Sequence, residues 1–303
     1  MPRFAEELRQ RRHGYWLVHL RTVPRPAPAP GACGKIGAVM TVASQPPELA
    51  GIVARLRAAG CVFAEDEAGL LVEAAGTPAE LAAMVDRRIA GHPLEQVLGW
   101  AEFAGLRILL EPGVFVPRRR TELLVREAAA VAPPGALVVD LCCGSGAIGA
   151  ALLATGDRIE LHAVDIDPAA VRCARRNIAA AGGGQVYPGD LYAPLPTTLQ
   201  GQVDVVVANV PYVPTEAIDT LPPEAREHEP PLALDGGPDG LEVLRRVTTQ
   251  AARWLAPGGH LFVETSSGQV GQAVDAFERG GLVPRVARSA ELGATVVAGR
   301  RPV

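Results

Sequence analysis

The stretch Ala-Leu-Val-Val-Asp-Leu-Cys-Cys-Gly-Ser-Gly-Ala-Ile-Gly, residues 136–149, decides the fold. It begins with an apolar run that includes Asp140 near its end, as a buried strand does, and continues into a glycine-rich turn followed by a helical pattern. A turn of this kind lets a ligand approach the backbone and the first N–H groups of the helix. The stretch therefore predicts a ligand at the carboxyl end of this strand.

After this stretch the sequence alternates strand and helix. Strands are expected at residues 136–141, 160–165, 203–208, 260–265 and 295–299, and helices at residues 146–153, 168–181, 240–255 and 270–280. The strands are almost continuously apolar, which indicates parallel strands buried on both faces. We predict an α/β fold with a Rossmann-like, mostly parallel, doubly wound sheet, whose ligands lie beyond the carboxyl ends of the strands.

The sequence before this sheet begins with two different regions. Residues 1–45 are rich in proline and arginine and show no periodicity, so we expect a disordered extension. It is either an arm for targeting or partner binding, or a dispensable segment ahead of a true start at Met40. Residues 46–98 predict a small helical subdomain, in which one helix opens with a capping box formed by Thr77 and Glu80.

A β-hairpin is expected over residues 99–118, between this subdomain and the sheet. Its strands are residues 103–110 and 114–116, and the Glu-Pro-Gly sequence at residues 111–113 is expected to form its turn. Residues 119–303 then form the catalytic domain.

The composition excludes several classes of protein. The net charge of −4 argues against a large duplex-binding surface, and no apolar run is long enough to span a membrane. Five cysteines without a Cys-x-x-Cys pair indicate neither a disulfide framework nor a zinc site. Adjacent Cys142 and Cys143 could form a reactive pair, but small side chains in a tight turn are the favoured interpretation. We expect a cytoplasmic monomer with no metal, no stable nucleic acid and no membrane partner.

A second motif, Asn209-Val210-Pro211-Tyr212, directly follows the apolar run at residues 203–208. It suits a planar, conjugated NH2 group, whose delocalised lone pair makes it a poor nucleophile. The Asn209 side-chain oxygen and the Val210 carbonyl can accept its two N–H bonds, while the Tyr212 ring packs on the flat group. Together with the glycine turn, the motif suggests a methyltransferase acting on a planar nitrogen.

The glycine turn by itself does not choose the cofactor. Its G-x-G-x-x-G spacing, with Asp165 at the end of the next strand, also fits a dinucleotide such as NAD. Two features favour S-adenosylmethionine: Asp140 could orient a cationic amino group, and Asp190 with Leu191 offers a carboxylate and an apolar side chain to an adenine. Asp165 has an alternative role as a helix cap before Pro168.

The chain resembles the HemK/PrmC-type protein glutamine-N5 methyltransferases over roughly residues 85–280. The matching segments are residues 88–97, 115–118, 121–122, 140–146, 165, 189–190, 209–212, 229–230, 233–237, 239–241 and 257–259. The resemblance implies a class I S-adenosylmethionine-dependent methyltransferase fold. It also implies S-adenosylmethionine as methyl donor, S-adenosylhomocysteine as product, and a glutamine amide of a peptide-chain release factor as acceptor.

The resemblance also implies roles for individual residues. The implied cofactor residues are Cys142, Cys143, Gly144, Ser145, Gly146, Asp165, Leu191 and Asn209, beside Asp140 and Asp190. The implied acceptor residues are Asn209, Val210, Pro211 and Tyr212, with Pro117, Arg118 and Glu122 packing over the site. For Arg118 and Glu122 the alternative is an ion pair at the entry of a helix.

The chain departs from the family pattern in three places. Val210 stands where the family has proline, and Arg120 stands where it has an acid. The helical subdomain is also shorter than the family's usual bundle. The acceptor is therefore left open between a release factor, another protein, a small molecule and adenine N6 of a nucleic acid. A cofactor-binding protein without catalysis is the alternative from another class.

Overall fold

The computed structural model describes residues 47–155 and 158–303. The extension expected over residues 1–45, with Met40, lies outside the described residues. The described chain divides after Leu98 into two compact units, of which the second runs from Gly99 to Val303. In the part of the chain that the structure describes, no helix is long and apolar enough to cross a membrane.

Within the described residues, the first unit contains four helices around one apolar core. They are α2 (Pro47–Ala58), α3 (Ala64–Ala74), α4 (Pro78–Ile89) and α5 (Leu94–Leu98). Leu56, Leu71 and Val85 are among the core side chains. The cap at Thr77 is confirmed, because its Oγ1 accepts from the Glu80 N–H at 3.2 Å. The reciprocal bond of the predicted capping box is shifted by one residue: Glu80 Oε2 accepts from the Gly76 N–H, not the Thr77 N–H, at 2.8 Å.

The second unit begins with a hairpin whose turn differs from the expected one. Strands β1 (Trp100–Phe103) and β2 (Leu106–Leu109) pair antiparallel, so Ala104 and Gly105 form the turn. Both have positive φ, 50° and 74°, which gives a two-residue turn whose twist matches that of the strands. The hairpin turn predicted at residues 111–113 is therefore wrong. That segment does make a turn, but it leads away from β2 and starts no second strand.

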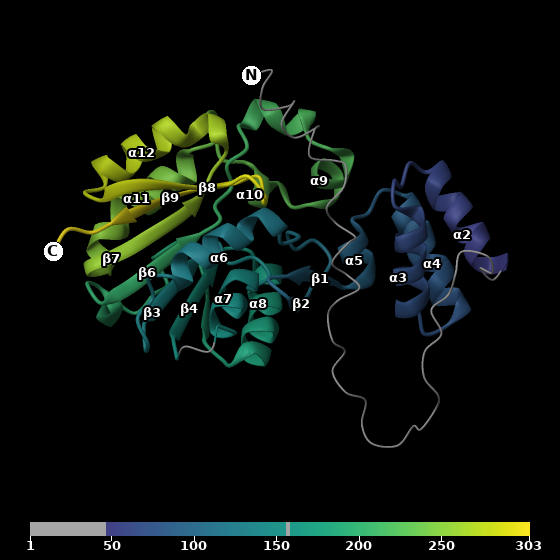
Figure 1. Cartoon of the computed structure of the whole chain (residues 1–303), viewed down its shortest axis with the longest axis horizontal. Coiled ribbons are helices and arrows are strands. Elements are labelled where there is room, and N and C mark those ends of the chain that lie inside the picture. Colours follow the sequence, from purple (N-terminus) through teal and green to yellow (C-terminus); the bar gives the residue numbers. More distant parts are fainter. Residues whose placement is uncertain (1–46, 156–157) are drawn as a thin grey trace. The chain divides into compact units, whose positions relative to one another are not determined.

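A seven-stranded sheet forms the centre of this unit (Figure 1). Its strands are β3 (Leu137–Leu141), β4 (Glu160–Asp165), β5 (Gln185–Pro188), β6 (Val203–Ala208), β7 (Leu255–Glu264), β8 (Val283–Ser289) and β9 (Ala294–Arg300). The order is β5-β4-β3-β6-β7-β9-β8, and β9 runs opposite to the other six strands. The predicted mostly parallel sheet is confirmed, although β5 and β8 were not predicted.

Helices cover both faces of the sheet (Figure 1). The helices α6 (Glu122–Ala129), α7 (Ala147–Leu153) and α8 (Pro168–Ala181) share one core with the sheet, and α11 (Glu242–Trp254) and α12 (Val270–Arg279) share the other. The strand order reverses between β3 and β6, so their carboxyl ends form the switch point of the sheet. Ligands of doubly wound sheets bind at that point.

Candidate active site

The turn after β3 shows why its glycines are needed. Cys142, Gly144 and Gly146 all have positive φ, at 56°, 54° and 77°. A Cβ added to Gly146 would lie 2.9 Å from the Cα of Ala174, so glycine lets α7 pack closely on α8. A Cβ on Gly144 would meet nothing within 4 Å. The turn is therefore packed tightly against α8 at Gly146, whereas the space beside Gly144 is open.

Asp140 is buried beneath this turn, and one of its two carboxylate oxygens accepts a hydrogen bond. Its side chain is 0% exposed, and Oδ2 accepts the Gly149 N–H at 3.1 Å. Oδ1 is buried and has no hydrogen-bond partner among the described residues. Burial raises the pKa of Asp140 to about 8. A cationic group beside Oδ1 would supply the missing partner and favour the ionised form.

Asp165 connects the ends of β3 and β4. Its Oδ2 accepts the Gly144 N–H at 2.7 Å, and its Oδ1 accepts the Asp167 N–H at 2.9 Å. The alternative role of Asp165 as a helix cap is wrong. Asp167 caps α8, because its Oδ1 accepts the Ala169 N–H at 2.8 Å. Burial raises the pKa of Asp165.

The two residues expected near an adenine lie in different environments. Leu191 is buried with a φ of 49°, whereas the Asp190 carboxylate forms a salt bridge with Arg246 at the protein surface. Ile166, which sequence reasoning missed, is 51% exposed directly beyond β4. The available signal was a large apolar residue between two acids just past a strand end. Its exposed side chain offers apolar contact area to a flat ring.

Cys142 and Cys143 do not form a disulfide. Burial raises the pKa of both thiols, so they are poor nucleophiles. Their contribution to the turn is structural: the Cys143 N–H donates to the Val164 carbonyl at 3.0 Å and joins the turn to β4.

Asn209 follows β6 and presents a second buried acceptor. Its Nδ2 donates to the Thr121 hydroxyl at 3.5 Å, and Thr121 is 2% exposed. Asn209 Oδ1 is buried without a hydrogen-bond partner among the described residues. Asp140 pairs in register with Val207, and Asn209 follows two residues later, directly beyond the end of β6. Two unsatisfied acceptors thus lie on neighbouring strands at the switch point.

The loop from Asn209 to Tyr212 is held by its surroundings even though Val210 replaces a proline. Val210 is 1% exposed, and the Tyr212 carbonyl accepts from Gln269 Nε2 at 3.0 Å. A Cβ on Gly236 would lie 2.7 Å from the Pro211 carbonyl oxygen, which shows how closely the next segment approaches. Backbone contacts therefore supply part of the rigidity that proline would give.

Arg118 and Glu122 do not pair with each other, so the predicted alternative of an ion pair between them is wrong. Arg118 Nη2 lies 2.6 Å from both oxygens of Glu229, whose side chain is 0% exposed. Glu122 accepts from the Ala104 N–H at 3.3 Å and lies 3.6 Å from Arg126. The backbone of Arg118 is extended before the 3-10 helix η1 (Arg119–Thr121), which directs the two side chains to different partners.

Arg120, in η1, makes the contacts that sequence reasoning did not foresee. Its Nε donates to Glu264 Oε1 at 2.8 Å, and its Nη2 donates to the Tyr212 hydroxyl. The guanidinium carbon lies 5.7 Å from the centre of the Tyr212 ring. Glu264 ends β7 and is 2% exposed. An acid at the end of an otherwise apolar strand was the available signal, because a buried carboxylate requires a cation.

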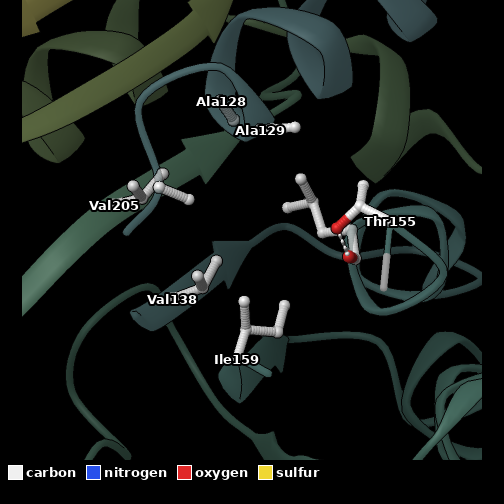
Figure 2. Close-up of a pocket in the computed structure, with 8 residues that line it drawn as sticks. Ala128, Ala129, Val138, Thr155, Ile159 and Val205 are labelled. Carbon is white, nitrogen blue, oxygen red and sulfur yellow. Dashed lines mark hydrogen bonds between the residues drawn. The ribbon is translucent and has the colours of Figure 1, made fainter. Parts of the chain in front are cut away.

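A small pocket lies elsewhere in this unit and is apolar (Figure 2). Its lining includes Val138 from β3, Val205 from β6 and Ile159, which directly precedes β4. Thr155, the polar side chain of its lining, donates its hydroxyl to the Leu152 carbonyl at 2.8 Å. Val138 and Val205 lie toward the amino ends of β3 and β6, whereas the acceptors described above lie at the carboxyl ends. The pocket brings no reactive groups together.

Comparison with known proteins places the chain among methyltransferases. Residues 105–221 match the family model described as "Methyltransferase small domain". The release factor glutamine methyltransferase of Geobacter sulfurreducens is 40% identical over 209 residues, 68% of this chain and 72% of that protein. That of Mycolicibacterium smegmatis is 42% identical over 200 residues, 65% of this chain and 70% of that protein.

A relative named for a different substrate and a solved structure complete the comparison. The 4-amino-L-phenylalanine/4-methylamino-L-phenylalanine methyltransferase of Streptomyces pristinaespiralis is 40% identical over 207 residues, 65% of this chain and 69% of that protein. A methyltransferase structure from Pyrococcus furiosus superposes with a TM-score of 0.51 at 16% identity, covering 66% of this chain and 90% of that one. The latter supports the fold alone.

Proposed function

The chain belongs to the HemK/PrmC-type family of glutamine methyltransferases, and from this membership we propose that it methylates a glutamine side-chain amide of a peptide-chain release factor. S-adenosylmethionine is the proposed methyl donor. The fold is that of a class I methyltransferase. The observation that carries the proposal is Asn209: its Oδ1 is a buried acceptor without a partner among the described residues, at the switch point of the sheet.

The residues around the turn fit S-adenosylmethionine. Asp140 Oδ1 lacks the partner that a cationic amino group would provide, and the backbone above Gly144 is open. Asp165 would accept hydroxyls of the ribose, and Ile166 with Leu191 would contact the adenine. When bound, the cofactor supplies an electrophilic methyl group on a positively charged sulfur.

The acceptor motif supplies orientation and charge stabilisation. The Asn209 side-chain oxygen and the Val210 carbonyl accept the two amide N–H bonds, which directs the nitrogen toward the methyl group. Positive charge develops on this nitrogen as it is methylated, so both acceptors bind the transition state more strongly than the ground state. Thr121 orients the Asn209 amide through Nδ2. The proton then leaves to water, and no strong base is required.

The test replaces Asn209 and measures methyl transfer to a release factor that carries a Gly-Gly-Gln loop. We expect Asn209→Ala to lower turnover by about 100- to 1,000-fold, as removal of a transition-state partner does. The affinity for S-adenosylhomocysteine, measured by calorimetry, should change by less than about threefold. Gln202→Ala is the matched control, because Gln202 precedes the amino end of the same strand, β6. Retained turnover in Asn209→Ala would refute the assignment.

A small aromatic amine is the second candidate acceptor. The observation that favours it is the relative from Streptomyces pristinaespiralis, which is named for amino-phenylalanine substrates. An aryl amine is also a planar, conjugated NH2 group, so the same two acceptors could hold it. Incubation of the wild-type protein with labelled S-adenosylmethionine, the release factor, 4-amino-L-phenylalanine and nucleic acid decides which molecule gains the methyl.

A further inference from the structure

We propose that Arg120 is a positioning residue: held by Glu264, it fixes the orientation of the Tyr212 ring against which the acceptor amide packs. The inference rests on the proposed function for the role of Tyr212. It adds Arg120, which lies outside the Asn209 to Tyr212 motif, to the residues that position the acceptor.

The contacts of Arg120 join two elements that are far apart in the sequence. Its Nε is bound to Glu264 Oε1 at 2.8 Å, and its Nη2 donates to the Tyr212 hydroxyl. The guanidinium carbon lies 5.7 Å from the ring centre, within the range of a cation–π contact. Arg120 therefore binds the phenol at its oxygen while remaining near its ring, and Glu264 fixes the arginine itself.

The ion pair is buried deeply enough to hold this geometry. The side-chain exposures are 27% for Arg120 and 2% for Glu264. Burial lowers the pKa of Arg120, but Tyr212 and the Glu264 carboxylate outweigh it, so the pKa lies above its ordinary value. The Arg120 guanidinium therefore stays charged near neutral pH. Salt screens its ion pair with Glu264 less than it screens an ion pair on the surface.

The Tyr212 ring needs a support that the backbone does not provide. Gln269 holds the carbonyl of Tyr212 at 3.0 Å, which fixes the backbone, whereas the orientation of the ring is set by its side-chain torsions. A short acidic side chain at position 120 has no donor for the phenol oxygen when ionised, whereas arginine has five.

A double-mutant cycle tests the role in catalysis. We expect Arg120→Met to lower kcat/KM by about 10- to 100-fold in the wild-type background, mainly through kcat, because a misplaced ring misaligns the acceptor. In a Tyr212→Phe background, which lacks the phenol oxygen, the same substitution should cost less than about threefold. Equal losses in both backgrounds would overturn the proposal, since a structural role does not depend on that oxygen.

Arg119→Met is the matched control, because Arg119 is the neighbouring arginine and lies 3.8 Å from the exposed Glu291. It should leave kcat/KM within about twofold in both backgrounds. If Arg120→Met does not fold because Glu264 keeps an uncompensated charge, the same cycle is run in a Glu264→Gln background, with Glu264→Gln as reference. In that background too, Arg120→Met should cost less when Tyr212 is replaced by Phe, and equal losses would overturn the proposal.

A measurement without turnover separates this proposal from the proposed function. The chain has four tyrosines, so ring-labelled protein gives a spectrum in which Tyr212→Phe identifies the Tyr212 signal. Arg120→Met should shift or broaden that signal, and Arg119→Met should not. An unchanged signal overturns the positioning role. If no acceptor is methylated by the wild type, the proposed function fails, and the ring spectrum still decides the role of Arg120.

Discussion

The cofactor side and the acceptor side of the proposed site are built in different ways. The cofactor side centres on one continuous segment, β3, its turn and α7, to which the ends of β4 and β5 add Asp165, Ile166 and Leu191. The acceptor side combines the loop after β6 with Thr121 and Arg120 from η1 and Glu264 from the end of β7. The first depends on backbone conformation and the second on long-range side-chain contacts. Substitutions on the cofactor side should therefore change stability and cofactor affinity, whereas substitutions on the acceptor side should change kcat/KM.

The largest expected effect concerns the turn, where two glycines differ in their surroundings. Gly146→Ala combines a positive φ with a Cβ only 2.9 Å from the Ala174 backbone, so we expect it to cost about 4 kcal/mol from strain and overpacking together. Gly144→Ala has a similar φ but open space around it, so it should cost about 1 kcal/mol. Urea unfolding of both variants measures the difference.

Similar losses at the two glycines would show that the turn is not tightly packed against α8. Gly144→Ala should instead reduce affinity for S-adenosylhomocysteine more than it reduces stability, because its Cβ occupies the open space above the turn.

An intermediate effect concerns pH, through Asp140. Its pKa rises from 3.8 to about 8 on burial, so between these values the folded state keeps a proton that the unfolded state releases. The contribution of Asp140 to the stability of the protein without cofactor should therefore fall as pH rises toward 8, by at most about 1.4 kcal/mol per pH unit. Asp165, whose pKa is also raised, acts in the same direction.

Denaturant unfolding of the wild type and Asp140→Asn between pH 5 and 8 measures this contribution. Asp140→Asn should flatten the decline, since its amide does not titrate. Affinity for S-adenosylhomocysteine should show the opposite trend in the wild type and rise with pH up to about 8, because binding of its ammonium group favours the ionised carboxylate. An identical slope in wild type and variant would contradict the assignment of Asp140.

The sequence predicted what depends on neighbouring residues. The alternation of apolar strands and helices, the turn after β3 and the cap at Thr77 are all local patterns, and the structure contains each of them. The hairpin turn was misplaced because Pro112-Gly113 is a stronger local signal than Ala104-Gly105, while pairing with β1 decides the turn. Local sequence did not distinguish these two possibilities.

The acceptor side was predicted only in part, for the same physical reason. Asn209 and Tyr212 form a recognisable motif, but the partner of Arg118 is Glu229 and that of Arg120 is Glu264, 111 and 144 residues away. Charge alone does not choose among the many acids of the chain. Only the sheet order, which places the end of β7 beside the end of β6, brings Glu264 to Arg120.

The smallest expected effect concerns Val210, and it tests whether the acceptor loop needs its missing proline. In the wild type, Val210→Pro should change kcat/KM by less than about threefold, because a compatible proline contributes only about 0.4–1 kcal/mol of pre-organisation. In an Arg120→Met background the same substitution should recover several-fold of the lost activity, since the loop then lacks its side-chain support. Steady-state kinetics of the four proteins measures both steps. A recovery no larger than the wild-type change would mean that Arg120 and residue 210 act independently, and the acceptor side would then be less cooperative than its long-range contacts indicate.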